Sequence, residues 1–193
     1  MNYLAHLFLS CEDEELMIGN FIADFVKNHY REELSPRVLE GIQLHRIIDS
    51  FTDRHPAVVQ ATRLLHPKHH KYSPVLMDVF FDYLLVENWE VYGQESLEDF
   101  STRVYAILSK NIDLIPEPFQ ARTLNMVQHR WLMSYMTLAG MEDTFERMKK
   151  RVSKPEYFEE AVVSLQEHHE ELTATFHTFF PEIIGVVQRN CFC

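Results

Sequence analysis

Apolar side chains recur along this chain at steps of three and four residues, the spacing that places them on one face of an α-helix. Leu76, Val79, Phe80, Tyr83 and Leu84 show the pattern most clearly. Glycine is scarce, at 5 of 193 residues, and few segments alternate between apolar and polar residues. Both observations argue against a turn-rich β fold. We therefore expect an all-α helical bundle.

The helix boundaries are marked by residues that favour helix starts. Ser35-Pro36 and Ser73-Pro74 each supply an N-cap hydroxyl followed by proline in the first helical turn. The segment 66–72 is the most loop-like stretch, and it is locally basic. We expect helices near residues 2–10, 14–28, 36–52, 56–65, 74–91, 96–110, 117–138, 141–152 and 156–178, and a last short one after Pro181.

Length, charge and cysteine content restrict the class of protein. A chain of 193 residues fits one domain, spanning 1–193. A net charge of −11 disfavours nucleic-acid binding, which needs a basic face. The odd set Cys11, Cys191 and Cys193 indicates free thiols in a reducing cytosol. Without a secretory signal or an apolar run of roughly 20 residues, we expect a soluble cytoplasmic protein with no membrane partner.

Histidines, aspartates and asparagines of the first half stand inside apolar runs, where a soluble helix normally keeps its buried stripe free of charge. Several are spaced four residues apart, so the members of each pair share one helix face. Buried acids that lie close together repel one another, and a divalent cation removes that repulsion. Imidazole nitrogen with carboxylate oxygen suits Mn²⁺, Fe²⁺ or Zn²⁺ better than Ca²⁺. The pairs are Asn2/His6, Asn20/Asp24, His45/Asp49, Asp49/Asp53 and Asp78/Asp82.

Each of these residues also has a purely structural interpretation. His6 could be a hydrogen-bonded core histidine, Asp49 a solvated helix acid, and Asp82 the partner of a neighbouring arginine. Arg46 and Arg54 lie beside the same aspartates in the sequence. Their guanidinium groups could bind a phosphate, or they could form salt bridges with those aspartates. The joint pattern favours a metal site more strongly than any single residue does.

Four motifs of the first half resemble those of the acyl carrier protein phosphodiesterases, also called acyl carrier protein hydrolyases. The resemblance covers nearly the whole chain and is dense before residue 90. The motifs are Asn2-Tyr-Leu-Ala-His6-Leu, Gly19-Asn20-Phe-Ile-Ala-Asp24-Phe-Val, Gly41-Ile-Gln-Leu-His45-Arg46-Ile-Ile-Asp49-Ser-Phe-Thr-Asp53 and Met77-Asp78-Val-Phe-Phe-Asp82.

This resemblance implies an all-α fold distantly related to the HD phosphohydrolases. It also implies a divalent metal, typically Mn²⁺, and cleavage of 4′-phosphopantetheine from the serine of holo acyl carrier protein, a reaction of fatty acid metabolism. The metal-site candidates that it implies are His6, Asp24, His45, Asp49 and Asp78. HD enzymes carry an adjacent His-Asp doublet, which this chain lacks. Either His45 and Asp49 replace the doublet across one helical turn, or the relationship is too remote for ligands to be assigned one by one.

We therefore expect a metal-dependent phosphodiesterase, with Mn²⁺ preferred and Mg²⁺, Fe²⁺ or Zn²⁺ as alternatives. Asp24 is expected to act in catalysis as well as in metal binding. Asp82 or Asp53 would orient the attacking water or act as general acid, and Arg46 or Arg54 would neutralise developing charge.

Two rival functions stay open at this point. One is an HD-like phosphohydrolase that acts on a nucleotide or another small phosphoester. The other is a non-enzymatic helical binding module. A carrier-protein enzyme needs a local basic surface to meet its acidic partner, and Arg63, Lys68 and Lys71 are the candidates.

Overall fold

The computed structural model describes residues 1–191, apart from the side chains of Asn28 and His29. Within residues 1–191 every regular element is helical, which confirms the all-α prediction. The α-helices are α1 (Tyr3–Phe8), α2 (Glu14–Ile22), α3 (Pro36–Arg54), α4 (Pro56–His69), α5 (Ser73–Glu87), α6 (Trp89–Tyr92), α7 (Leu97–Lys110), α8 (Glu117–Gln128), α9 (Leu138–Lys149), α10 (Ala161–Glu167) and α11 (His169–Arg189). The 3₁₀-helices are η1 (Asn28–Glu33), η2 (His70–Tyr72), η3 (Ile112–Leu114), η4 (Trp131–Met136) and η5 (Pro155–Phe158).

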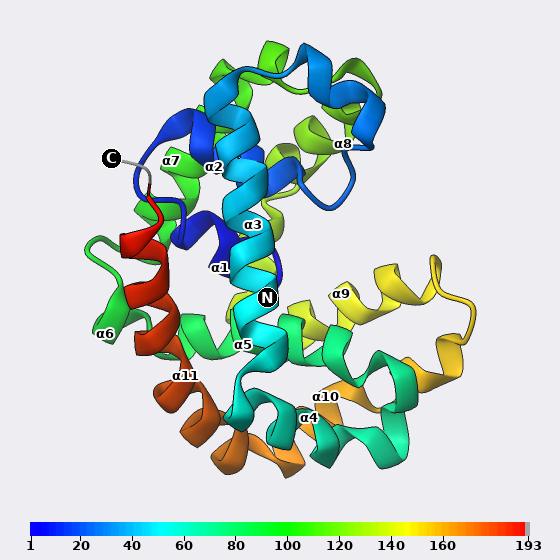
Figure 1. The fold of residues 1–193 in the computed structure, drawn as a ribbon. Coiled ribbons are helices and arrows are strands. Elements are labelled where there is room, and N and C mark those ends of the chain that lie inside the picture. Colours follow the sequence, from blue (N-terminus) through cyan, green and yellow to red (C-terminus); the bar gives the residue numbers. More distant parts are fainter. Residues whose placement is uncertain (192–193) are drawn as a thin grey trace.

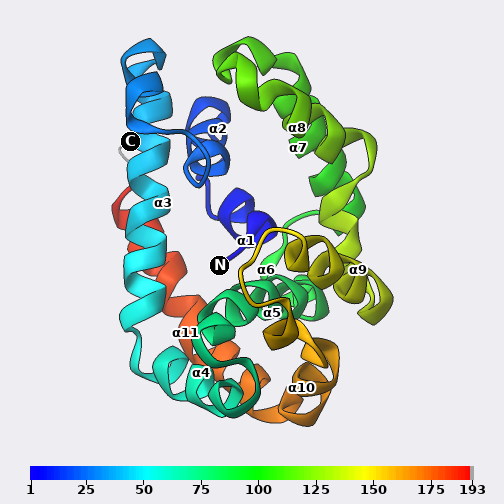
Figure 2. The ribbon, with the colours of Figure 1, turned by 90° about the vertical axis from the view of Figure 1, so that its right-hand side faces the viewer.

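The short helix α1 lies between two groups of helices. Figure 2 shows α3 on one side of it and α7, α8 and α9 on the other, while α5 passes below. Helix α5 is apolar almost all round, as expected for a helix buried on every side. Its residues Phe80 and Phe81 are fully buried, and Phe81 stacks on Phe179 of α11 with ring centroids 5.2 Å apart. The core therefore runs beneath α1 and holds it in place.

Helices α2 and α3 cross at unusually short range (Figure 1). A Cβ atom on Gly19 would lie 2.0 Å from the carbonyl oxygen of Val38, and one on Gly41 would lie 2.2 Å from that of Leu16. Real Cβ atoms do not approach backbone oxygens so closely, so only glycine fits at these two positions. The contact brings the end of α2 against the middle of α3.

Two predicted helices end earlier than expected. The helix expected at 14–28 ends at Ile22, so Asp24 lies in the turn that follows it. The helix expected at 117–138 ends at Gln128, because Arg130 adopts a left-handed conformation with φ 49°. The buried hydroxyl of Tyr105 accepts the N–H of Leu132 after this break, so a tertiary contact replaces a helical bond. No glycine or proline marks the position in the sequence.

The C-terminal helices also differ from expectation. The segment 156–178 is divided at His168, because α10 packs on α9 whereas α11 packs on α3, α4 and α5. Helix α11 then continues through Pro181 to Arg189. Proline removes the bond to the carbonyl four residues earlier, but Pro181 and His177 are both exposed, so water can bond that carbonyl instead.

The segment 66–72 is helical rather than a loop, since it forms the end of α4 and all of η2. His69 is fully buried there, with Nδ1 2.8 Å from the carbonyl oxygen of Tyr157 and Nε2 2.8 Å from the Ser164 hydroxyl. Lys68 forms an ion pair of 2.9 Å with Glu167. Lys71 donates to Ser153 Oγ at 3.1 Å, so two members of the expected basic surface, Lys68 and Lys71, have contacts within the protein.

The expectation of free thiols is also wrong for two of the three cysteines. Cys11 and Cys191 form a disulfide, with their Cα atoms 6.0 Å apart. The bond joins the turn after α1 to the residue that follows the last turn of α11. Cys193 lies outside the described residues.

Candidate functional site

Asn20, near the end of α2, positions two histidines. Its Oδ1 accepts the Nδ1–H of His6 at 2.8 Å, and its backbone oxygen accepts the Nδ1–H of His45 at 2.9 Å. The amide nitrogen of Asn20 donates to the backbone oxygen of His6 at 2.7 Å and to Ser10 Oγ at 3.0 Å. With both Nδ1 atoms engaged as donors, both Nε2 atoms are left for another partner, as in the second shell of many metal sites.

The two histidine rings meet the carboxylate of Asp49 in what we name the histidine–aspartate cluster (His6, His45 and Asp49). The rings stack with centroids 3.9 Å apart and planes 15° apart. Nε2 of His6 lies 3.1 Å from Asp49 Oδ1, and Nε2 of His45 lies 3.0 Å from Asp49 Oδ2. One ligand atom from each residue lies within 4.8 Å of the others, which is compact enough for one metal ion.

Charge at the cluster is dominated by its carboxylates. Burial alone would lower the pKa of His45, but hydrogen bonds to Asp24 and Asp49 raise it to about 9. Burial lowers the pKa of His6, so the second imidazole tends to be neutral. Burial opposes ionisation of Asp49, yet the hydrogen bond from His45 and the nearby N-terminal ammonium hold its pKa below the usual value. The cluster therefore favours positive charge beside Asp49, which either a proton or a metal ion can supply.

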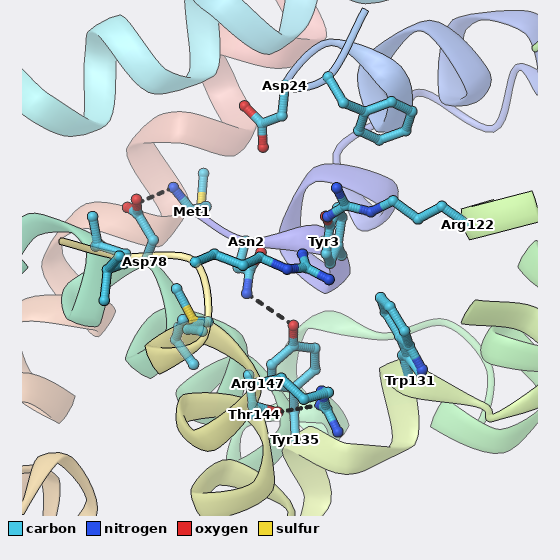
Figure 3. Close-up of a pocket in the computed structure, with 16 residues that line it drawn as sticks. Met1, Asn2, Tyr3, Asp24, Asp78, Arg122, Trp131, Tyr135, Thr144 and Arg147 are labelled. Atoms are coloured by element: carbon cyan, nitrogen blue, oxygen red, sulfur yellow. Dashed lines mark hydrogen bonds and ion pairs between the residues drawn. The ribbon is translucent and has the colours of Figure 1, made fainter. Parts of the chain in front are cut away.

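Asp24 and Asp78 flank the cluster on two sides. Asp24 Oδ1 lies 3.1 Å from Nε2 of His45, and its side chain is 59% exposed. Asp78, on α5, binds the N-terminal ammonium of Met1 at 2.8 Å (Figure 3). That ammonium lies 3.8 Å from Asp49 Oδ1. The structure thus brings all five metal candidates into one region, with Asp24 and Asp78 at its edges.

Asp82 does not occupy the position expected of a catalytic acid. It is completely buried, and its two oxygens accept the backbone N–H groups of Leu4 at 2.9 Å and Ala5 at 3.1 Å. Burial raises the pKa of Asp82 to about 7, against the opposing effect of these bonds. The carboxylate satisfies the first turn of α1, whose amides have no helical partner. Its role is to anchor α1 rather than to orient a water.

Arg46 and Arg54 are exposed, and among the described residues no ion pair joins either of them to Asp49 or Asp53. They line a separate hollow between α3 and α11, together with Phe51 and Glu182. On a helix, a residue nine positions from His45 points to the opposite side, which is why Arg54 faces away.

A pocket of about 330 Å³ opens beside the cluster, between α1 and helices α5, α8 and α9. Asp24 and Asp78 are among the residues that line it. Three arginines also line it, and we name them the arginine wall (Arg122, Arg147 and Arg151). Figure 3 shows Asp24 and Arg147 on opposite sides, with Tyr3 and Asn2 between them.

Ring and hydroxyl contacts hold two of these arginines. Arg122 donates to the hydroxyl of Tyr3 and lies over the ring of Phe25, with its central carbon 5.2 Å from the ring centroid. Arg147 donates to Thr144 Oγ1 at 2.8 Å and lies 5.5 Å from the centroid of Trp131. The arginine wall was not anticipated from the sequence, and neither was the role of Asn20. For Asn20 a signal existed, since it stands one helical turn from Asp24 in the second motif.

Comparisons with known proteins agree with the motifs. A family model described as acyl carrier protein phosphodiesterase matches residues 1–183. Proteins named acyl carrier protein phosphodiesterase are similar over their whole length. The one from Photorhabdus laumondii is 28% identical over 193 residues, covering 100% of this chain and 98% of that protein. The one from Yersinia enterocolitica is 30% identical over 189 residues, covering 97% and 98%. No solved structure matches the chain.

Proposed function

This chain belongs to the acyl carrier protein phosphodiesterase family, and from that premise we propose that it hydrolyses the phosphodiester between 4′-phosphopantetheine and a serine of holo acyl carrier protein. The activity is that of a phosphoric diester hydrolase, and the products are apo acyl carrier protein and free 4′-phosphopantetheine. The observation that carries the proposal is the compact histidine–aspartate cluster at the edge of a pocket large enough for an organic phosphate.

The cluster suits a divalent cation. Asn20 engages both Nδ1 atoms, so His6 and His45 present Nε2 toward Asp49. Two imidazole nitrogens and a carboxylate form a donor set suited to Mn²⁺, Fe²⁺ or Zn²⁺. We propose that His6, His45 and Asp49 hold the ion, that Asp24 or Asp78 completes the set, and that Mn²⁺ is preferred. Such an ion lowers the pKa of water and polarises a phosphoryl oxygen.

The chain's own groups supply the remaining chemistry. Asp24 lies between the cluster and the pocket and stays ionised, because its hydrogen bond to His45 keeps its pKa low despite partial burial. It can therefore accept a hydrogen bond from the attacking water and orient it. The water oxygen bonds to phosphorus as the bond from phosphorus to the serine oxygen breaks. A proton from the water ends on the serine.

The direct experiment is to incubate the purified protein with holo acyl carrier protein and Mn²⁺ and to measure the mass of the carrier. Loss of the phosphopantetheine mass is expected in Mn²⁺ and not in EDTA. Measurement of the metal content before and after EDTA treatment links the loss of activity to loss of the ion. An intact carrier in Mn²⁺, with hydrolysis of a nucleotide or other small phosphoester instead, would contradict the proposed substrate.

Within residues 1–191 no helix is both long enough and apolar enough to cross a lipid bilayer. The proposed substrate is a protein, which would dock at the mouth of the pocket. We propose holo acyl carrier protein as the partner, in line with the names of the family and of the relatives.

A further inference from the structure

The arginine wall carries positive charge that no neighbouring carboxylate neutralises. Among the described residues, no ion pair joins Arg122, Arg147 or Arg151 to an aspartate or glutamate. This is notable in a chain that has 29 acidic side chains against 18 lysines and arginines. Like charges that line one pocket repel each other unless an anion lies between them. The basic side of the pocket therefore has a place for an anion.

Two of the guanidinium groups are held in place and still have N–H donors left to bind an anion. Each arginine has five N–H donors in a planar fork. Arg122 is fixed by Tyr3 and Phe25, and Arg147 by Thr144 and Trp131. These contacts use neutral groups and ring faces, so they restrict the side chains without cancelling their charge. Such a fork binds the oxygens of a phosphate in pairs.

The two acids that line the pocket do not pair with the arginines, because each has another cationic partner. Asp24 is bonded to His45, and Asp78 is bonded to the ammonium of Met1. Both acids thus have cationic partners, whereas none of the three arginines has an anionic partner among the described residues. A phosphate in the pocket would contact the arginine wall on one side and face the histidine–aspartate cluster on the other.

A third part of the pocket is apolar. Val75 and Val79 of α5 line it, and so do Met148 of α9 and Val152 beyond it. A bare phosphate has no use for such a surface, whereas a phosphate that carries an uncharged organic chain can bury part of that chain against it. The pocket volume of about 330 Å³ allows both parts to enter together.

We propose that Arg122, Arg147 and Arg151 bind the phosphate of 4′-phosphopantetheine, and that the uncharged arm of this group lies along Val75, Val79 and Met148. The identity of the phosphate ester rests on the proposed function. The basic charge and the apolar strip do not depend on it. In this arrangement the prosthetic group enters the pocket, and the carrier protein stays outside.

Binding of the free product tests this directly. Isothermal titration of the full-length protein in EDTA would compare 4′-phosphopantetheine with pantetheine, which has a hydroxyl where the phosphate was. We expect the phosphorylated compound to bind at least about tenfold more tightly, because each charge-assisted hydrogen bond between an arginine and the phosphate strengthens binding by roughly that factor or more. In Arg147→Met this preference should fall about tenfold, with pantetheine affinity unchanged.

Two further variants separate charge from apolar contact. Met148→Gln should weaken both compounds about equally, because it leaves the arginines in place. Arg189→Met, an exposed arginine at the end of α11, is the matched control and should bind both compounds like the wild type. Circular dichroism establishes that each variant is folded. If Arg147→Met does not fold, Arg122→Met replaces it, with the same expected loss of preference.

If a folded arginine variant still prefers 4′-phosphopantetheine over pantetheine as strongly as the wild type does, the proposed phosphate site is wrong. If AMP and 4′-phosphopantetheine bind equally tightly, and Met148→Gln weakens neither of them, the uncharged arm of 4′-phosphopantetheine does not lie along the apolar residues. These measurements contain no metal and no hydrolysis. A failure of the proposed enzyme activity would therefore leave an arginine-dependent preference in place, and a failure of the arginine site would leave Mn²⁺-dependent hydrolysis in place.

Discussion

The histidine–aspartate cluster and the arginine wall of the neighbouring pocket are built in different ways. The histidine–aspartate cluster is held by hydrogen bonds among buried groups, with Asn20 contacting both imidazoles. The arginine wall consists of half-buried or exposed side chains, of which Arg122 and Arg147 rest on aromatic rings. A small cation needs ligands at fixed distances, whereas a phosphate accepts donors from many directions. The difference indicates that rigidity is concentrated where the geometry of a ligand demands it.

The largest loss of activity is expected for His45→Ala, which disrupts the histidine–aspartate cluster. It removes one of two imidazoles and leaves Asp24 and Asp49 without their common partner. We expect hydrolysis of holo acyl carrier protein to fall to the level seen in EDTA, and bound Mn²⁺, measured by elemental analysis, to fall with it. His66→Ala, at an exposed histidine of α4, is the control and should retain both. Full activity in His45→Ala would exclude this cluster as the metal site.

Asn20→Ala tests whether rigidity itself matters in that cluster. Both histidines remain, but His6 loses the side-chain oxygen that accepts its Nδ1–H, whereas His45 keeps the Asn20 backbone oxygen and loses only a longer side-chain contact of 3.2 Å. Loss of such supporting bonds typically costs about 10–100-fold in metal affinity or activity. Titration of Mn²⁺ into the metal-free variant, followed by activity at saturating Mn²⁺, measures the two effects separately. An unchanged Mn²⁺ affinity would mean that the histidines are positioned by the surrounding core alone.

A comparison of Arg147→Met with Arg54→Met sharpens the contrast between the structure and the sequence pattern. Arg147 lines the pocket, whereas Arg54 lines the hollow between α3 and α11. We expect kcat/KM for holo acyl carrier protein to fall about tenfold in Arg147→Met, from loss of charge-assisted hydrogen bonds, and to change less than about twofold in Arg54→Met. A larger loss of kcat/KM in Arg54→Met than in Arg147→Met would indicate that Arg54 acts at the site.

Reduction of the Cys11–Cys191 disulfide should have the smallest effect on activity, because neither cysteine lines the pocket beside the cluster. Its effect on stability is larger. The bond closes a loop with a sequence separation of 180, and disulfides typically stabilise by about 2–4 kcal/mol through restriction of the unfolded chain. Urea unfolding with and without dithiothreitol measures this difference. A reduced protein with equal stability but lower activity would show that the bond positions α1 instead.

Sequence patterns could predict residues of the histidine–aspartate cluster but not those of the arginine wall. His45 and Asp49 share a helix face, so their proximity could be predicted from spacing alone. Charged groups inside apolar runs are conspicuous, which is why the candidates of the first half were found. Asp82 was found for the same reason, but the sequence could not show that its partners are the amides of α1.

Arginines on partly exposed helices give no comparable signal. Arg122 and Arg147 occupy positions where a solvated charge is ordinary, and their convergence depends on how α8 and α9 pack around α1. Likewise the break at Arg130 depends on a contact with Tyr105 rather than on a helix-breaking residue. Features that arise from contacts between distant segments could not be predicted from local patterns.

The close contact between Gly19 and Gly41 has a consequence for mutational tolerance. The two glycines leave no room for a side chain, and the position of Asn20 relative to His45 depends on their contact. In a library that randomises α2 and α3, selection for folding alone should already return glycine at both positions. Asn20 should return only when activity is also selected, because other buried residues could fill its space. Two separate rounds of selection would thus distinguish the residues that build this scaffold from those that equip it for catalysis.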